Sequence, residues 1–339
     1  MMTQRDRSLF YFLYFTEFLS HQFKMGRGYH QKMQKKFESV LWQRLSSSDK
    51  STAPLSVDRV RDISPHDFSN EYLRKLKPVV LEGFCRSWPA AQKWNFKYLM
   101  DHYGDIQIPF PKDPDGRRGE PVALRALLES VLNNSEPRHI DFRPFLASAP
   151  ELKSALDHPA LRKLAGLQAR LPFLSNAYIG QRNYRSTFHN DIAHNFLLNF
   201  CGEKTMMLLS LSETPLLYPN AGFPPAGTYS FRTKFSENVM FDSQFEEFPL
   251  ARFAQRMEVK LSPGDVLFLP VFTWHQARYE TPTIGIGNWW PSFKDAFLAN
   301  PLFALLSLPH YAEACQRLRR MNSRFRESAE SKNQIGMVK

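Results

Sequence analysis

Short apolar segments alternate with turn residues between positions 171 and 294, a pattern typical of short strands joined by tight connections. Residues 261–265, Leu-Ser-Pro-Gly-Asp, form a predicted turn, and the apolar residues 266–270 that follow form a predicted strand. Outside this region the spacing of apolar residues is different. Residues 120–132 and those after 295 have the spacing that is typical of helices. The pattern therefore predicts a mainly β core with flanking helices.

The same pattern divides the chain into four parts. They are a basic, aromatic-rich helical segment with its linker (1–55), a mixed α/β part (56–170), the β core (171–294) and a C-terminal helical extension (295–339). A polar run at 46–54 marks the first boundary. Within the core, residues 218–247 begin with several prolines and glycines, which predicts a long loop over the mouth of the core.

Three residues of the core have the spacing of a metal site. His189 and Asp191 are two positions apart, and in a strand such residues project from the same face, so both can reach one ion. His275 follows the predicted strand 266–270 by a few residues. Two imidazoles and one carboxylate on one side of an ion form the facial triad of non-haem iron(II) enzymes. On spacing alone, each histidine could equally be a hydrogen-bonded structural residue or a surface residue.

Further residues frame this triad at characteristic spacings. They are Ser186, Asn195, Lys204 and Asn288. With this frame, the sequence resembles the JmjC or cupin-like 2-oxoglutarate oxygenases. It resembles more closely their hydroxylase branch, which includes the asparaginyl hydroxylase of hypoxia-inducible factor and the arginyl hydroxylase resembling lysine demethylases. Upstream, residues 77–83, 88–90 and 104–105 look like the opening of such domains, so the resemblance covers about residues 70–294.

The resemblance implies a double-stranded β-helix, the jelly-roll fold of cupin and JmjC domains, in which two sheets enclose a site at one open end. It implies iron(II) bound by His189, Asp191 and His275, with 2-oxoglutarate and O2 as co-substrates. These three residues would be both the metal ligands and the catalytic centre.

The remaining residues of the frame would bind the co-substrate. Lys204 would hold the 5-carboxylate of 2-oxoglutarate, because a lysine on an otherwise apolar strand needs an anionic partner. Ser186 would add a hydroxyl donor to the same carboxylate. Asn195 and Asn288 would orient the co-substrate or a metal-bound carboxylate through amide hydrogen bonds. The position of Asn288 depends on the register of its strand, which can shift by one residue.

Composition favours an intracellular enzyme. Three cysteines without Cys-x-x-Cys spacing, Cys85, Cys201 and Cys315, indicate neither a disulfide framework nor a zinc ribbon. They favour a reducing compartment, which suits iron(II), so the sequence predicts a cytoplasmic location. The apolar run 9–15 is followed by Glu17 without a small-residue cleavage site, and we interpret it neither as a secretory signal nor as a transmembrane helix.

The formal net charge of +11 is concentrated at the two ends of the chain. Residues 1–50 hold nine basic and four acidic residues, and five arginines lie between 317 and 326. Basic ends are compatible with nucleic acid, peripheral contact with an anionic membrane or an acidic protein substrate, and also with solubility alone. We expect the N-terminal segment to pack on the barrel. The helices after residue 297 are candidates for pairing two chains into a homodimer.

Two classes of function remain open. In the first, the protein is a dioxygenase that hydroxylates a C–H bond on a protein or peptide side chain, with RNA or a small-molecule natural product as alternative substrates. Demethylation shares the same oxidation step, and the hydroxylase-like frame favours hydroxylation. In the second class, the protein is a non-catalytic cupin-fold binding module. An intact triad together with Lys204 argues against such a module, which has no need of these ligands.

Overall fold

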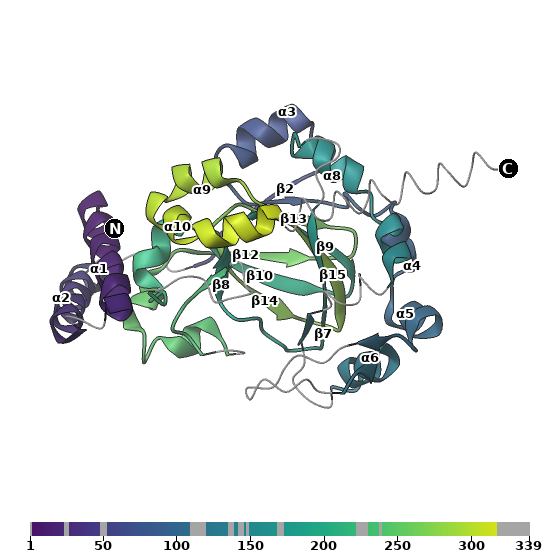
Figure 1. The fold of residues 1–339 in the computed structure, drawn as a ribbon, viewed down its shortest axis with the longest axis horizontal. Coiled ribbons are helices and arrows are strands. Elements are labelled where there is room, and N and C mark those ends of the chain that lie inside the picture. The colour runs from purple at the N-terminus through teal and green to yellow at the C-terminus, as the bar shows by residue number, and fades with distance from the viewer. Residues whose placement is uncertain are drawn as a thin grey trace.

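The computed structural model describes residues 2–23, 27–47, 53–108, 120–134, 139–141, 146, 149–167, 173–221, 230–236 and 239–316. Two sheets face each other and enclose an interior (Figure 1). The six-stranded sheet contains, in spatial order, β1 (Leu55–Ser56), β12 (Arg256–Leu261), β10 (Lys204–Leu209), β14 (Trp274–Tyr279), β8 (His189–Asp191) and β11 (Ser230–Arg232). The seven-stranded sheet contains β2 (Asp58–Val60), β3 (Val79–Leu81), β13 (Val266–Leu269), β9 (His194–Cys201), β15 (Thr283–Trp290), β7 (Leu174–Gly180) and β6 (His139–Asp141).

The helices surround these sheets. The α-helices are α1 (Gln4–Phe23), α2 (Arg27–Ser46), α3 (Pro65–Phe68), α4 (Pro89–Lys93), α5 (Phe96–Tyr103), α6 (Leu124–Leu132), α8 (His158–Leu164), α9 (Phe293–Ala299) and α10 (Pro301–Leu306). Shorter helical turns are η1 (Ser69–Leu73), η2 (Pro150–Ala155), η3 (Leu211–Leu216), η4 (Phe241–Gln244) and η5 (Pro249–Phe253), and β4 (Gln107–Ile108) pairs with β5 (Val122–Ala123). Neighbouring strands are mostly far apart in sequence, as in a jelly roll, and the predicted β core with flanking helices is confirmed.

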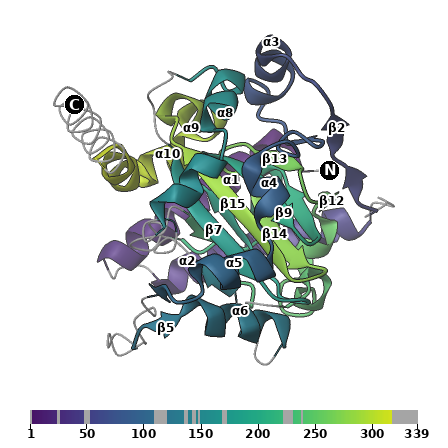
Figure 2. The same cartoon turned by 90° about the vertical axis from the view of Figure 1, so that its right-hand side faces the viewer.

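Alternate residues of the central strands face opposite sides of the seven-stranded sheet. On β9, Phe196 and Leu198 pack in the core beneath the outer helices, whereas Leu197 packs in the core inside the barrel. On β13, Phe268 faces outward and Leu267 inward in the same way. The outer face is covered by α4 and α5 (Figure 2). Burial on both faces explains why these strands are continuous apolar runs in the sequence.

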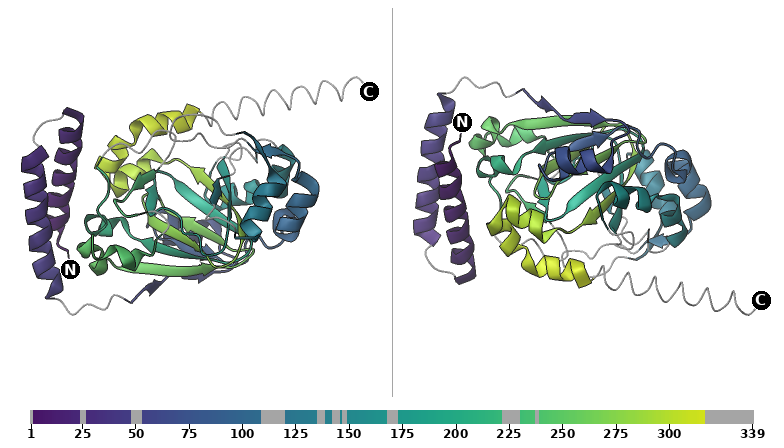
Figure 3. Two further views of the ribbon diagram at one scale, coloured as in Figure 1. Left: turned by 90° about the horizontal axis from the view of Figure 1, so that it is seen from below. Right: turned by 90° about the horizontal axis from the view of Figure 1, so that it is seen from above.

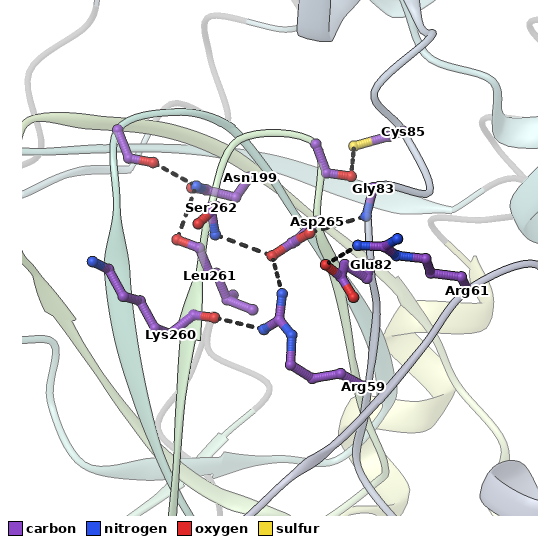
Figure 4. A network of polar contacts seen from close by, with 12 residues as sticks. Arg59, Arg61, Glu82, Gly83, Cys85, Asn199, Lys260, Leu261, Ser262 and Asp265 are labelled. Atoms are coloured by element: carbon purple, nitrogen blue, oxygen red, sulfur yellow. Dashed lines mark hydrogen bonds and ion pairs between the residues drawn. The ribbon is translucent and has the colours of Figure 1, made fainter.

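A buried aspartate fixes the predicted turn before β13. Asp265 accepts hydrogen bonds from the backbone N–H groups of Ser262 (3.1 Å) and Gly83 (3.0 Å), and Arg59 pairs with it at 2.8 Å (Figure 4). Gly264 in this turn has a φ of 93°, a conformation that favours glycine. The network therefore ties β2 and the residues after β3 to a turn that is distant in the sequence.

The N-terminal helices α1 and α2 form a hairpin that packs on one side of the barrel, whereas α4, α5 and α6 lie on another side (Figure 1, Figure 3). The inner apolar residues of the hairpin share one core with η3, η5 and α10. The Tyr14 hydroxyl donates a hydrogen bond of 2.8 Å to the carbonyl of Asn220, which ties α1 to the segment after η3. Among the described residues, no helix is long and apolar enough to cross a membrane.

Two local predictions need correction. The helix predicted at 120–132 begins only at Leu124, because the two preceding residues form β5. Residues 218–247 are not a loop throughout, since they contain the strand β11, which pairs with β8. Residues 222–229 and 237–238 of that segment, and the basic run at 317–326, lie outside the described residues.

Candidate metal centre

Two paired strands bring the predicted triad together. His189 and His275 are register partners on the antiparallel strands β8 and β14, and their ring centroids lie 4.2 Å apart. Asp191 is two residues after His189 and projects from the same face of β8. The Nε2 atoms of His189 and His275 lie 3.8 Å and 3.9 Å from the Asp191 carboxylate oxygens, and one ligand atom from each residue lies within 4.8 Å of the others. The three residues are therefore close enough to share one ion.

Backbone carbonyls select the tautomer that binds a metal. The Nδ1 atom of His189 lies 2.7 Å from the carbonyl of Thr187, and the Nδ1 atom of His275 lies 2.9 Å from that of Thr273. A carbonyl only accepts hydrogen bonds, so each Nδ1 carries the proton and each Nε2 keeps a lone pair. Burial and the neighbouring His189 lower the pKa of His275 to about 4. His275 is therefore neutral near pH 7, which is the form that coordinates metal.

Two residues outside the predicted frame hold the Asp191 carboxylate. The Ser230 hydroxyl on β11 donates to Oδ1 at 2.7 Å, and the Trp289 indole Nε1–H on β15 donates to Oδ2 at 2.8 Å. Ser230 is the register partner of Asp191. Hydrogen bonds of this kind orient metal ligands. Ser230 follows a proline- and glycine-rich run that predicts a loop, and the family resemblance points to Asn288 rather than to the adjacent Trp289, so neither residue was predicted.

Lys204 lies inside the barrel as a buried cation. It is 1% exposed, and its Nζ lies 5.3 Å from the centroid of the Tyr279 ring. A Cβ on Gly285 would come within 2.8 Å of this Nζ, so glycine at that position leaves room for the ammonium group. Among the described residues, no carboxylate lies within ion-pair distance of Lys204. Burial lowers the pKa of Lys204 to about 7.

The register places Lys204 at a distance from the metal ligands that suits a small dicarboxylate. Lys204 pairs with Tyr279 on β14, and Leu208 pairs with His275. The lysine backbone is therefore four residues along the strand from the metal-binding position, which is about 13 Å at the rise of a β-strand. A lysine side chain and a five-carbon co-substrate can together fill that interval. The cation and the triad thus fit the two ends of 2-oxoglutarate.

The other predicted co-substrate residues are placed differently from one another. The Ser186 hydroxyl accepts a hydrogen bond of 2.9 Å from the backbone N–H of Ala277, which lies two residues after His275 on β14. The Asn195 side chain is buried, and its Oδ1 accepts the backbone N–H of Asn288 at 2.9 Å. Ser186 therefore lies next to β14 and Asn195 lies on β9, and their roles toward a co-substrate remain predictions.

The Asn288 side chain does not point toward the triad or Lys204. Its Oδ1 accepts hydrogen bonds from His158 Nε2 at 3.0 Å and from the Ser175 hydroxyl at 2.7 Å. These partners belong to α8 and β7 on the helix-covered side of the seven-stranded sheet. The next residue, Trp289, projects to the opposite side and reaches Asp191. The structure thus directs Trp289 toward the triad, in the place where Asn288 was expected.

The fold and this site together define a jelly-roll barrel with a candidate mononuclear metal centre. A family model described as "Cupin-like domain" matches residues 65–296, which is more than half of the chain. The chain belongs to this family. Oxygenases of its JmjC class use iron(II), 2-oxoglutarate and O2, and the triad in this chain fits that metal.

Curated relatives support the same class. Lysine-specific demethylase 8 of Xenopus tropicalis is 28% identical over 241 residues, covering 69% of this chain and 53% of the relative. Jumonji C domain-containing protein 5 of Drosophila melanogaster is 24% identical, covering 70% and 61%. The human "Bifunctional peptidase and (3S)-lysyl hydroxylase JMJD7" is 23% identical, covering 70% and 84%. The chain therefore spans little more than half the length of the first two relatives.

Proposed function

We propose that this protein is an iron(II)- and 2-oxoglutarate-dependent dioxygenase that hydroxylates a C–H bond on a protein or peptide side chain. The observation that carries the proposal is the joint arrangement of the triad and of Lys204 inside one barrel. His189, Asp191 and His275 would bind the iron on one side and leave coordination positions for the co-substrate and O2. When bound, the iron supplies the oxidation of the substrate C–H bond, driven by decarboxylation of 2-oxoglutarate.

The residues of this chain have separate tasks in the proposed reaction. The Thr187 and Thr273 carbonyls keep the two imidazoles in the tautomer that offers Nε2 to the metal. Ser230 and Trp289 fix the plane of the Asp191 carboxylate. Lys204, assisted by Ser186, would bind the 5-carboxylate at the end of the co-substrate that is away from the metal. Asn195 would orient the co-substrate through amide hydrogen bonds. The apolar barrel interior would keep bulk water from the reacting groups.

Demethylation is the second candidate, because five of the matched relatives of this class are named lysine-specific demethylases. Oxidation of an N-methyl carbon gives a hydroxymethyl amine that releases formaldehyde, whereas oxidation of a carbon elsewhere leaves a stable alcohol. The likeness to the asparaginyl hydroxylase branch, the alternative RNA and small-molecule substrates, and a homodimer through residues after 297 stay predictions. The free cysteines suit a reducing compartment, and we propose a cytoplasmic location.

The proposed function predicts about one iron(II) per chain, bound anaerobically through the triad. Isothermal titration with iron(II) and then 2-oxoglutarate should show ordered binding, and a succinate-release screen over peptides, RNA and small molecules should identify the substrate class. Formaldehyde release measured in the same reactions separates demethylation from hydroxylation. His189→Ala and Asp191→Ala should abolish turnover and strongly weaken iron binding.

A matched control is His66→Ala, since the His66 side chain is 82% exposed on α3. This variant should bind iron and turn over 2-oxoglutarate like the unmodified protein. Full metal affinity and full turnover in both triad variants would show that the assignment of the metal centre is wrong.

A further inference from the structure

The N-terminal hairpin carries apolar side chains on two opposite sides. The inner side of α1 packs against the barrel, with Tyr11 and Tyr14 both in ring contact with Phe303 of α10. On the side of α1 away from the barrel, Phe12 is 63% exposed and Phe23 is 68% exposed. A helix that only covers a barrel needs one apolar face. The second apolar face of α1 therefore has no role in packing within the described part of the chain.

Helical spacing groups these exposed residues on one side of each helix, and we call these two sides together the outer face. On α1, residues 5, 9, 12, 16 and 23 recur at intervals of three, four or seven and share one side. On α2, residues 29, 36 and 40 do the same, on the side opposite to Trp42, which packs on Phe253 of η5. The large apolar members of the outer face are all exposed: Leu9, Phe12, Phe23, Tyr29 and Val40.

Only basic charges accompany the outer face among the described residues of the hairpin. Exposed lysines and one arginine lie on or beside it: Arg5, Lys32, Lys35 and Lys36. The acidic residues are engaged elsewhere, since Asp6 pairs with Arg44 of the other helix and Glu17 pairs with Lys234 of the barrel. Glu38 accepts a hydrogen bond from Gln34, and burial raises its pKa. The carboxylates of the hairpin are thus paired or partly buried, whereas Arg5, Lys32, Lys35 and Lys36 are exposed.

We propose that the outer face of the hairpin docks on an anionic lipid bilayer surface, with Leu9, Phe12 and Phe23 inserted at the headgroup level and Lys32 and Lys36 beside lipid phosphates. Apolar and aromatic side chains next to lysines are the composition of helices that lie in a membrane interface. Each lysine near such a surface adds electrostatic attraction to anionic lipids. The hairpin lies at the periphery of the barrel, where a flat surface can reach it (Figure 3).

Two other occupants fit the outer face less well. A second copy of the chain would bring the same lysines and arginine of two outer faces together without an acidic partner, which is electrostatically unfavourable. A nucleic acid would satisfy the lysines, and its bases could stack on aromatic rings, but the aliphatic Leu9 and Val40 offer no stacking surface. An anionic bilayer would attract the lysines through its phosphates and would also bury the aliphatic side chains.

The test is flotation of the full chain with phosphatidylcholine vesicles, with and without a minority of phosphatidylglycerol, at low and physiological salt. We expect binding to the vesicles that contain phosphatidylglycerol, weakened by salt. Lys32→Gln with Lys36→Gln should lower the partition coefficient about 30-fold, from about fivefold for each lysine. Phe12→Ser with Phe23→Ser should lower it at least about tenfold through lost apolar burial. All four side chains are exposed, so the thermal unfolding midpoint should not fall.

The matched control is Leu298→Ser, because Leu298 is 71% exposed and belongs to α9 rather than to the hairpin. This variant should float like the unmodified protein, and an equal loss in it would overturn the assignment to the outer face. A concentration-dependent dimer that Phe12→Ser abolishes, without vesicle binding, would replace the bilayer by a second copy. Binding to RNA that the lysine variants lose and the phenylalanine variants keep would also overturn the proposal.

Discussion

The two ends of the barrel interior differ in how their polar groups are satisfied. At the metal end, both Nδ1 atoms of the histidines and both carboxylate oxygens of Asp191 have hydrogen-bond partners within the protein. At the other end, Lys204 is buried, and no carboxylate of the described residues pairs with it. The metal end is therefore organised before any ligand arrives, whereas the Lys204 end would be completed by the proposed co-substrate.

This difference has an energetic consequence. Burying the hydrogen-bonded triad costs little free energy, because its polar groups exchange water for hydrogen-bond partners within the protein. An ammonium group buried without an anion is unfavourable, and the protein relieves this cost by lowering the pKa of Lys204 to about 7. A dicarboxylate that supplies an anion would offset this cost, so part of its affinity would come from neutralising the buried cation.

The largest expected effect tests the Lys204 end. Lys204→Ala should weaken 2-oxoglutarate binding by roughly 2–4 kcal/mol, or about 30- to 1,000-fold, because it removes a charge-assisted hydrogen bond. Iron binding should be unchanged, since no metal ligand is altered. Anaerobic titration calorimetry with iron(II) present measures both affinities. The control is Lys260→Ala on the neighbouring strand β12, where the lysine is 57% exposed and pairs with Glu203.

The same residue predicts a pH dependence of stability in the free protein. The pKa of Lys204 falls from 10.5 to about 7 on burial, so between these values the unfolded chain binds a proton that the folded chain has released. Stability should therefore rise with pH from 7 to about 10 and should be lowest below pH 7. Lys204→Met should remove this dependence and raise stability near pH 7 by about 1–3 kcal/mol, measured by denaturant unfolding. An unchanged affinity for 2-oxoglutarate and an unchanged pH profile would place Lys204 in a structural role.

The triad could be predicted from the sequence because its arrangement depends on local features of the chain. The pairing of His189 with Asp191 needs only the two-residue repeat of a strand, and the turn that precedes β13 needs only its proline and glycine. Ser230 could not be found in this way, because its contact with Asp191 depends on the pairing of β11 with β8. Long-range pairing is set by packing of the whole barrel and has no local signal.

The orientation of the side chains on β15 shows a second limit of prediction from the sequence. The pairing of β15 with β9 shifts between Ile284 and Gly285, whose partners are Cys201 and Asn199, so the extra residue, Phe200, lies on β9. The count along β15 itself is unbroken, and the alternation of its side chains directs Trp289 rather than Asn288 to Asp191. A signal was present in the glycines, because Gly287 leaves space for the Trp289 indole, whose ring a Cβ there would meet at 2.4 Å. Glycine at alternate positions of a strand indicates close approach by another group.

A smaller effect is expected from the residues that orient the Asp191 carboxylate. Ser230→Ala and Trp289→Phe each remove one donor to it, and each should lower iron(II) affinity about tenfold without abolishing binding. Competition with a chelator gives the affinity, and the visible absorption of cobalt(II) in the same site reports the changed ligand geometry. Trp290→Phe is the matched control, since Trp290 packs on Phe196 at a ring distance of 4.7 Å outside the barrel interior. Equal affinity in all three variants would mean that the metal end is not organised by these two donors.

The smallest effect on the site is expected at Asn288. Asn288→Ala leaves His158 and Ser175 without their shared acceptor, which should cost about 1–3 kcal/mol of unfolding free energy. Affinity for 2-oxoglutarate should stay the same, because the side chain faces the helix-covered side of the sheet. Thermal unfolding and calorimetry on one preparation separate the two outcomes. A large loss of co-substrate affinity with unchanged stability would restore the predicted register and place Asn288, instead of Trp289, inside the barrel.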